Sequence, residues 1–191
     1  MFFNKRNNCR FCSFLLVLVL FFLIPNFGHT GDMTTVLLEA IKNGDVNSVN
    51  ALIAKGTDVN AADRSGITPL IYAAKIGQSG CVNILLENGA YVNSQCKLGG
   101  TPLMWSAENG HAEIVKVLID NGADLNPCDF YGWTPLMKAV YGGHVDSVQV
   151  LVKNKAKVNI KNNGGITALY IAELKAQPEI LRLLEEVGAI K

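Results

Sequence analysis

The chain has 191 residues, of which 17 are basic and 16 acidic, giving a formal net charge of +1 at pH 7. This length is enough for one domain with a sizeable core. Without residues 1–30, which we interpret below as an export signal, three basic residues are lost and the charge becomes negative. The composition therefore excludes the basic footprint of a nucleic-acid-binding protein and gives no reason to expect an anionic membrane surface as the target.

Residues 1–30 have the layout of a secretory signal peptide. Three basic residues precede an apolar run over residues 11–24, and Pro25 ends that run. Because the run is shorter than the roughly 20 residues that a spanning helix needs, we expect a cleaved signal and an exported protein, periplasmic or secreted. The alternative is an uncleaved anchor, attached to the membrane through residues 11–27, with the following domain outside the cytoplasm.

The rest of the chain repeats itself at a fixed interval. Thr-Pro-Leu or Thr-Ala-Leu stands at residues 68–70, 101–103, 134–136 and 167–169. A second phrase, typified by NGADLN, stands at residues 55–60, 88–93, 121–126 and 154–159. A third signal is the glycine at positions 44, 77, 110 and 143, replaced by Ala176 in the last unit. A constant period in this range indicates stacked supersecondary units.

Each phrase has a local physical cause. Thr is a good N-cap and Pro is tolerated at the first helical position, so each Thr-Pro pair predicts the start of a helix. The glycine that follows in the same unit ends that helix, and an apolar pattern such as residues 114–119 predicts a second one. Gly89 and Gly122 then supply the left-handed backbone that ends the second helix.

This pattern resembles the ankyrin repeat, a turn and two antiparallel helices in about 33 residues with Thr-Pro-Leu-His opening the first helix. The resemblance covers residues 33–191 and implies an all-α fold, a solenoid of stacked helix-turn-helix units with hairpin-like turns. We place the five units at residues 34–62, 65–94, 98–127, 131–160 and 164–191. The first and last units are atypical, as expected for capping repeats.

The sequence departs from the family pattern at two kinds of position. The family's His after Thr-Pro-Leu is replaced by Ile71, Met104, Met137 and Tyr170, so apolar packing must substitute for its hydrogen bonds. Lys155 stands where the phase requires a left-handed glycine. A left-handed Lys costs about 1–2 kcal/mol relative to Gly.

The sequence indicates no catalytic residue, metal ligand or cofactor. His111 and His144 follow the inter-helix glycine at the same repeat phase, so we expect them to cap or pack at the start of a second helix. Neighbouring repeats are too far apart for a disulfide between Cys96 and Cys128, and we expect free thiols there and a buried Cys81. We therefore predict that the protein is not an enzyme.

The resemblance implies that partner contacts come from the turns and the exposed side of the first helices, which together form a concave surface. Four aromatic residues of the fourth unit stand at positions expected to be exposed, and Trp and Tyr are common binding hot spots. The candidate partner-binding residues are Lys97, Leu98, Trp105, Glu108, Phe130, Tyr131, Trp133, Lys138 and Tyr141.

We predict a monomeric, non-catalytic protein that binds another protein, outside the cytoplasm, through this surface. Two alternatives remain at this point. The domain is a docking platform tethered to a membrane by its N-terminal segment, or it is a secreted effector or toxin-like protein that acts on a host protein.

Overall fold

The structure is a computed structural model that describes residues 33–190. The chain divides into two units, Met1–Asp32 and Met33–Lys191, and we describe the second. The predicted signal peptide or anchor at residues 1–30 lies outside the described residues. Within the described part, no helix has the length and apolar character needed to span a membrane.

Ten helices and no strand make up residues 33–190, which confirms the predicted all-α fold. They form five consecutive pairs. The first helices of the pairs are α2 (Met33–Lys42), α4 (Pro69–Ile76), α6 (Pro102–Glu108), α8 (Pro135–Gly142) and α10 (Ala168–Leu174). The second helices are α3 (Val46–Ala54), α5 (Ser79–Glu87), α7 (Ala112–Asp120), α9 (Val145–Lys153) and α11 (Pro178–Glu186).

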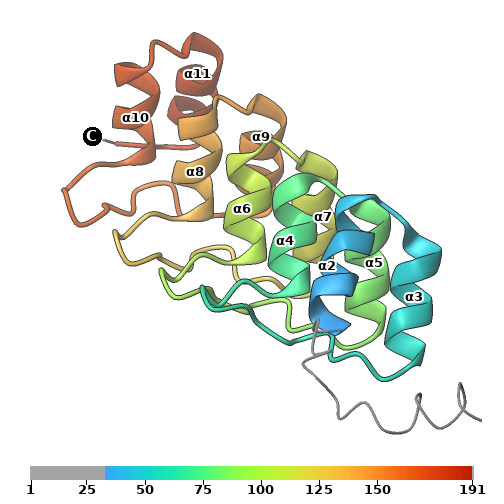
Figure 1. Ribbon diagram of the computed structural model, residues 1–191. Helices are drawn as coiled ribbons and strands as arrows, with labels where there is room; N and C mark the ends of the chain where they lie inside the picture. Colours follow the sequence, from blue (N-terminus) through green and yellow to red (C-terminus); the bar gives the residue numbers. More distant parts are fainter. Residues whose placement is uncertain (1–32, 191) are drawn as a thin grey trace, which may run out of the picture. The chain divides into compact units, whose positions relative to one another are not determined.

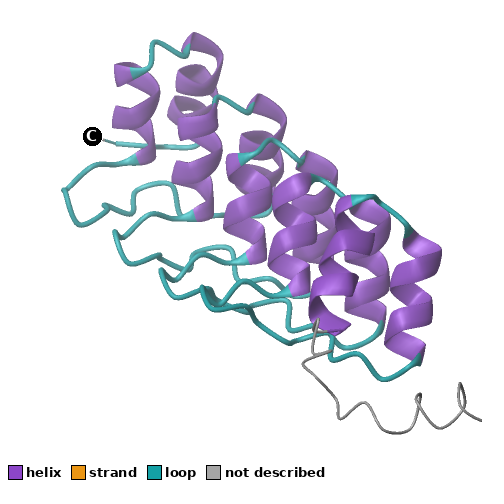
Figure 2. Ribbon diagram, in the orientation of Figure 1, coloured by secondary structure: helices purple, strands orange, loops and turns teal. Residues whose placement is uncertain are grey.

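The pairs stack in sequential order, so that the helices form two layers (Figure 1). In one layer each first helix contacts the first helices of its neighbours, and in the other layer the second helices do the same. The long connections between pairs lie together on one side of the layers (Figure 2). Every helix therefore has one side available to the core and one side available to solvent.

The first helices begin as the Thr-Pro phrase predicts. In the four units that contain it or its Thr-Ala variant, the threonine hydroxyl accepts a hydrogen bond from the backbone N–H three residues later, and the proline stands at the first helical position in three of them. The bonds run from Ile71, Met104, Met137 and Tyr170 to Thr68, Thr101, Thr134 and Thr167, at 3.2–3.3 Å. All four threonines are buried, so the caps also close the end of the core.

Left-handed backbone occurs at the turns where the glycine pattern predicts it. Gly77 and Gly143 end α4 and α8 in this conformation. Lys155 has φ of 66°, which confirms the prediction that it occupies a left-handed position, and Ala176 has φ of 51°. Two units of this stack therefore carry a residue with a Cβ at a position that favours glycine.

The core lies between the layers and repeats with the sequence. Alanines of the first helices and leucines of the second helices are fully enclosed at equivalent positions of successive units, as at Ala74, Ala107 and Leu85, Leu118, Leu151, Leu184. The small alanine side chains let neighbouring first helices approach closely. Of the residues that replace the family's histidine, Ile71, Met104 and Met137 are buried, as the apolar-packing prediction requires. The prediction is wrong for Tyr170 of the last unit, which is 46% exposed.

Polar side chains tie each unit to the next. His111 Nε2 lies 3.1 Å from the carbonyl oxygen of Lys75, and His144 Nε2 lies 3.0 Å from that of Glu108. Both histidines stand at the N-cap position of their second helix, where we expected them to cap or pack, but neither side chain makes a capping bond there. Their rings reach back to the preceding unit instead.

Candidate functional site

Four loop turns, which we call fingers, precede the first helices of units two to five. They comprise residues 63–67, 96–100, 129–133 and 162–166, and a backbone bond of 3.0 Å closes each of them between its first N–H and its last carbonyl. Neighbouring fingers are joined by backbone bonds from Lys97 to Ser65, from Phe130 to Leu98 and from Asn163 to Tyr131, at 2.9–3.1 Å. The fingers therefore form a continuous hydrogen-bonded row.

A side-chain acceptor holds the turn in three of the fingers. Oδ1 of Asp63, Asp129 and Asn162 accepts hydrogen bonds from the N–H groups two and four residues later, at 2.7–3.0 Å. The finger of unit three has Cys96 at this position, and its sulfur accepts no such bond. A thiol is a weak acceptor, so this finger lacks the support that its neighbours have.

The candidate residues lie on the fingers and first helices of units three and four, and they differ in exposure. Lys97, Leu98, Phe130, Tyr131 and Tyr141 are exposed, with 71% of Phe130 and 58% of Leu98 accessible to solvent. Trp105, Glu108, Trp133 and Lys138 are partly buried. The expectation that Trp133 is exposed is therefore wrong.

Trp133 is partly buried because it packs within its own unit. Its ring meets the Tyr141 ring edge-to-face, with 5.4 Å between centroids, and Lys138 Nζ lies 5.4 Å from the indole centroid. Phe130 and Tyr131 also meet edge-to-face, at 5.5 Å, but both remain exposed at the tip of the finger. Trp133 thus packs at the base of the finger, next to the first helix, and Phe130 and Tyr131 form its solvent-accessible end.

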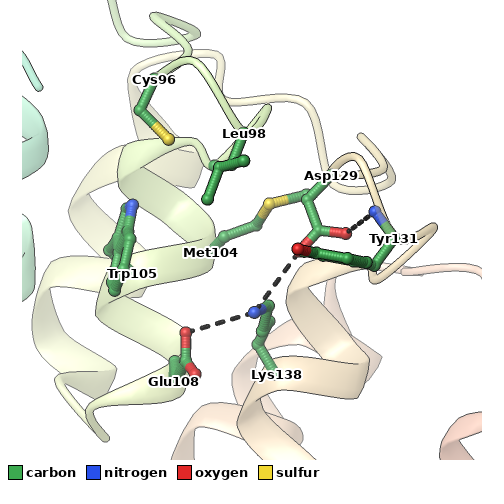
Figure 3. A pocket seen from close by; sticks show the side chains of 9 residues that line it. Cys96, Leu98, Met104, Trp105, Glu108, Asp129, Tyr131 and Lys138 are labelled. Carbon is green, nitrogen blue, oxygen red and sulfur yellow. Dashed lines mark hydrogen bonds and ion pairs between the residues drawn. The ribbon is translucent and has the colours of Figure 1, made fainter. Parts of the chain in front are cut away.

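A pocket of about 100 Å³ lies between units three and four (Figure 3). Leu98, Met104, Trp105 and Tyr131 form its mainly apolar walls, and Cys96, Gly100, Glu108, Asp129 and Lys138 complete the lining. Lys138 Nζ lies 3.5 Å from Glu108 Oε2 and 3.4 Å from Asp129 Oδ2. Figure 3 shows this ion-paired cluster at the end of the pocket away from Cys96.

Trp105 forms one wall and carries an unpaired donor. Its Nε1–H is buried and has no hydrogen-bond partner among the described residues. Trp105 stands one repeat before Lys138, and Cys96 stands one repeat before Asp129. In unit four, Lys138 pairs with the carboxylate of Asp129. In unit three, the equivalent residues are Trp105 and Cys96, and the indole nitrogen of Trp105 has no acceptor among the described residues.

A lysine of the second unit covers the Trp105 ring, with Lys75 Nζ 4.5 Å from the centroid. Lys175 Nζ lies in the same way 3.7 Å from the centroid of Tyr141 and donates to the Tyr141 carbonyl oxygen at 2.8 Å. Cation–π contacts of this kind hold a lysine in place at a partly exposed site. Ammonium groups thus lie over the aromatic side chains of the face that the fingers and first helices form.

The cysteine and histidine side chains of the described residues form no reactive cluster. Cys81, Cys96 and Cys128 are free thiols, and Cys81 is fully buried, as predicted. Burial, and to a lesser extent the negative charge of Asp45, raises the pKa of the Cys81 thiol. No group of three or more potential metal ligands occurs within residues 33–190.

Sequence reasoning missed part of this pocket. Met104, Cys96 and Asp129 line it but are absent from the predicted set. Aligning the fingers at the repeat period would have identified Cys96, because Asp63, Asp129 and Asn162 occupy the position at which unit three has this cysteine.

A family model described as ankyrin repeats (3 copies) matches the chain at residues 5–96, 37–129, 91–162 and 126–190. Comparison with curated proteins finds no match.

Proposed function

Because the chain belongs to the ankyrin-repeat family, whose repeats typically mediate binding to other proteins, we propose that it binds a protein partner through the fingers and first helices of units three and four. The protein presents a rigid surface and makes or breaks no covalent bond. Leu98, Phe130 and Tyr131 provide the exposed apolar contact area, and the neighbouring pocket receives one side chain of the partner.

The observation that carries this proposal is the irregularity of unit three. The other three fingers have an Asp or Asn as side-chain acceptor, but Cys96 provides none, and the Trp105 donor is left buried and unpaired. An unsatisfied buried donor costs about 1–3 kcal/mol. Departures of this kind from an otherwise consistent pattern are expected at functional sites. Here the departure coincides with a pocket beside exposed aromatic residues.

Variants at the fingertip test the proposal. We expect a Phe130→Ser and Tyr131→Ser double variant of the full chain to lose its bound partner in affinity capture from the native cells while its melting temperature changes little, because both side chains are exposed. The matched control is Tyr91→Ser, which removes an aromatic residue of 69% exposure outside the fingers. Equal capture by the wild type and the double variant would refute the assignment of the surface.

We also propose that the repeats act outside the cytoplasm, as a periplasmic or secreted protein. The support is the order of basic residues, apolar run and Pro25 in residues 1–30. Cell fractionation combined with N-terminal sequencing tests this. A mature chain that begins near residue 31 in the exported fraction supports the proposal. An intact N-terminus in the membrane fraction supports the tethered alternative instead, and an intact chain in the cytosol contradicts both.

A further inference from the structure

The two helix layers differ in net charge. In units two to five, the fingers and first helices are neutral in sum, with four basic residues, Arg64, Lys75, Lys97 and Lys138, and four acidic ones, Asp63, Glu108, Asp129 and Glu173. The second helices of the described stack carry seven acidic residues and three basic ones. The face that holds the exposed aromatic residues is therefore the more positive of the two.

The carboxylates closest to the pocket are already occupied. Glu108 and Asp129 share the ammonium group of Lys138, and Asp129 also accepts two backbone hydrogen bonds. Arg64, Lys75 and Lys97, by contrast, are exposed and have no carboxylate within ion-pair distance in residues 33–190. Of these three side chains, Lys75 over the Trp105 ring and Lys97 next to Cys96 in sequence lie at the Cys96 end of the pocket.

The donor at this end of the pocket also needs an acceptor. Trp105 Nε1 is unpaired, and a Cβ placed on Gly100 would lie 2.9 Å from it and 3.2 Å from Cys96 Sγ. The nitrogen therefore lies beside the part of the lining that Gly100 and Cys96 form. In the next unit the equivalent acceptor is the carboxylate of Asp129, which suggests that a carboxylate would fit as the acceptor for Trp105.

We propose that the partner is an acidic, extended protein segment, and that one of its carboxylates enters the pocket at the Cys96 end and accepts the Trp105 Nε1–H. This inference rests on the proposed function and specifies its partner. Lys75 and Lys97 supply the charge that attracts the segment, and Lys75 is already held over the Trp105 ring, so little side-chain freedom is lost on binding. Apolar side chains of the same segment contact Leu98, Phe130 and Tyr131. Because the N–H is covered in the free chain, the indole must shift to pair with the carboxylate.

The two tryptophans of the chain, Trp105 and Trp133, both lie in units three and four, so intrinsic fluorescence reports binding without a label. The probes are three capped peptides, each made of four identical triplets. They are Glu-Leu-Ser, its neutral counterpart Gln-Leu-Ser and its cationic counterpart Lys-Leu-Ser. With the full chain in mild detergent at about 50 mM ionic strength, we expect the Glu peptide to shift the emission and to bind about tenfold more tightly than either control. At about 500 mM salt this preference should largely vanish.

Two substitutions locate the contact. Trp105→Phe keeps an aromatic wall and removes the donor, so we expect about a tenfold loss of affinity for the Glu peptide. The fluorescence emission of the remaining tryptophan, Trp133, measures this affinity. Lys97→Gln should weaken the Glu peptide several-fold, whereas the matched control Lys116→Gln on α7 should not change it. Failure of the Glu peptide to bind, equal binding of the Gln or Lys peptide, or equal effects of Lys97→Gln and Lys116→Gln would overturn the inference.

The two proposals fail separately. If fingertip variants abolish partner capture but the peptides show no preference for acidic residues, the surface is correct and its assigned partner chemistry is wrong. If the Glu peptide binds as expected but the cellular partner is captured equally by the wild type and the fingertip variant, the acidic site exists and the proposed function of the surface is wrong.

Discussion

At Lys155 a side chain with a Cβ occupies a backbone conformation that favours glycine, with φ of 66°. The corresponding residues of the other units, such as Gly89 and Gly122, are glycines with φ of 84° and 85°. The strain at Lys155 is about 1–2 kcal/mol, partly offset in a glycine variant by the greater freedom of the unfolded chain.

We therefore predict that Lys155→Gly raises the free energy of unfolding by about 1 kcal/mol. Chemical denaturation monitored by circular dichroism measures this change. The control is Lys157→Gly in the same connection, where φ is not positive and glycine should destabilise slightly. A lower stability for Lys155→Gly than for the wild type would show that the strain is not released.

Residue-scale packing also separates the aromatic side chains into two groups. Trp133 contacts Tyr141 and Lys138 and is partly buried, whereas Phe130 is 71% exposed. We predict that Trp133→Ala costs about 2–3 kcal/mol of folding free energy and that Phe130→Ala costs less than about 0.5 kcal/mol. Thermal melts of the two variants test this, and equal melting temperatures would contradict the packing described above.

At the scale of a single element, the finger of unit three, residues 96–100, is the one of the four whose turn lacks a side-chain acceptor. We predict that Cys96→Asn supplies an acceptor for the N–H groups of Leu98 and Gly100 and stabilises the protein by about 1–2 kcal/mol. Denaturation midpoints of the variant and of a Cys96→Ser control measure the effect. If Asn is no better than Ser at this position, the missing amide acceptor is not the source of the irregularity.

The elements themselves were largely predictable from the sequence, because each one depends on local chemistry. Thr68 and its three equivalents cap helices through bonds that span only three residues, and the glycines bend the chain where they stand. Contacts between units were not predictable in this way. His111 bonds to the carbonyl of a residue 36 positions earlier, and Trp133 turns toward Tyr141 within its unit, so its exposure depends on packing that the periodicity does not specify.

The candidate site was predicted in location but not in detail. The exposed positions followed from the repeat phase and the family resemblance, since fingertip residues such as Phe130 have few neighbours. The pocket depends on which side chains of two adjacent units meet, as Met104 and Asp129 do, and the repeat period does not determine that.

At the scale of the whole stack, each unit is stabilised by the units on either side of it. Second helix α7 contacts both α5 and α9, whereas α11 contacts α9 as its only second-helix neighbour among the described residues. Leu118 of α7 and Leu184 of α11 are both fully buried, so the same truncation removes comparable packing at a central and at a terminal position.

We predict that Leu118→Ala lowers the protection of backbone amides against hydrogen exchange throughout residues 33–190. Leu184→Ala should lower this protection mainly in α10 and α11. In a stack of repeats a terminal unit can open while the remainder stays folded, but loss of a central unit breaks the contacts on both of its sides. Each substitution costs about 2–5 kcal/mol locally. Hydrogen exchange followed by mass spectrometry distinguishes the two patterns, and a uniform loss in both variants would show that the stack unfolds as one unit.

The row of fingers has a consequence for how this surface can change. Main-chain atoms make the bonds from Lys97 to Ser65, from Phe130 to Leu98 and from Asn163 to Tyr131, so these bonds do not require the outward side chains at positions such as 98 and 130. New recognition properties can therefore be introduced by replacing outward side chains on a fixed scaffold, without redesigning the scaffold. Tip positions such as 98 and 130 are natural starting points for libraries that redirect the protein to a different target.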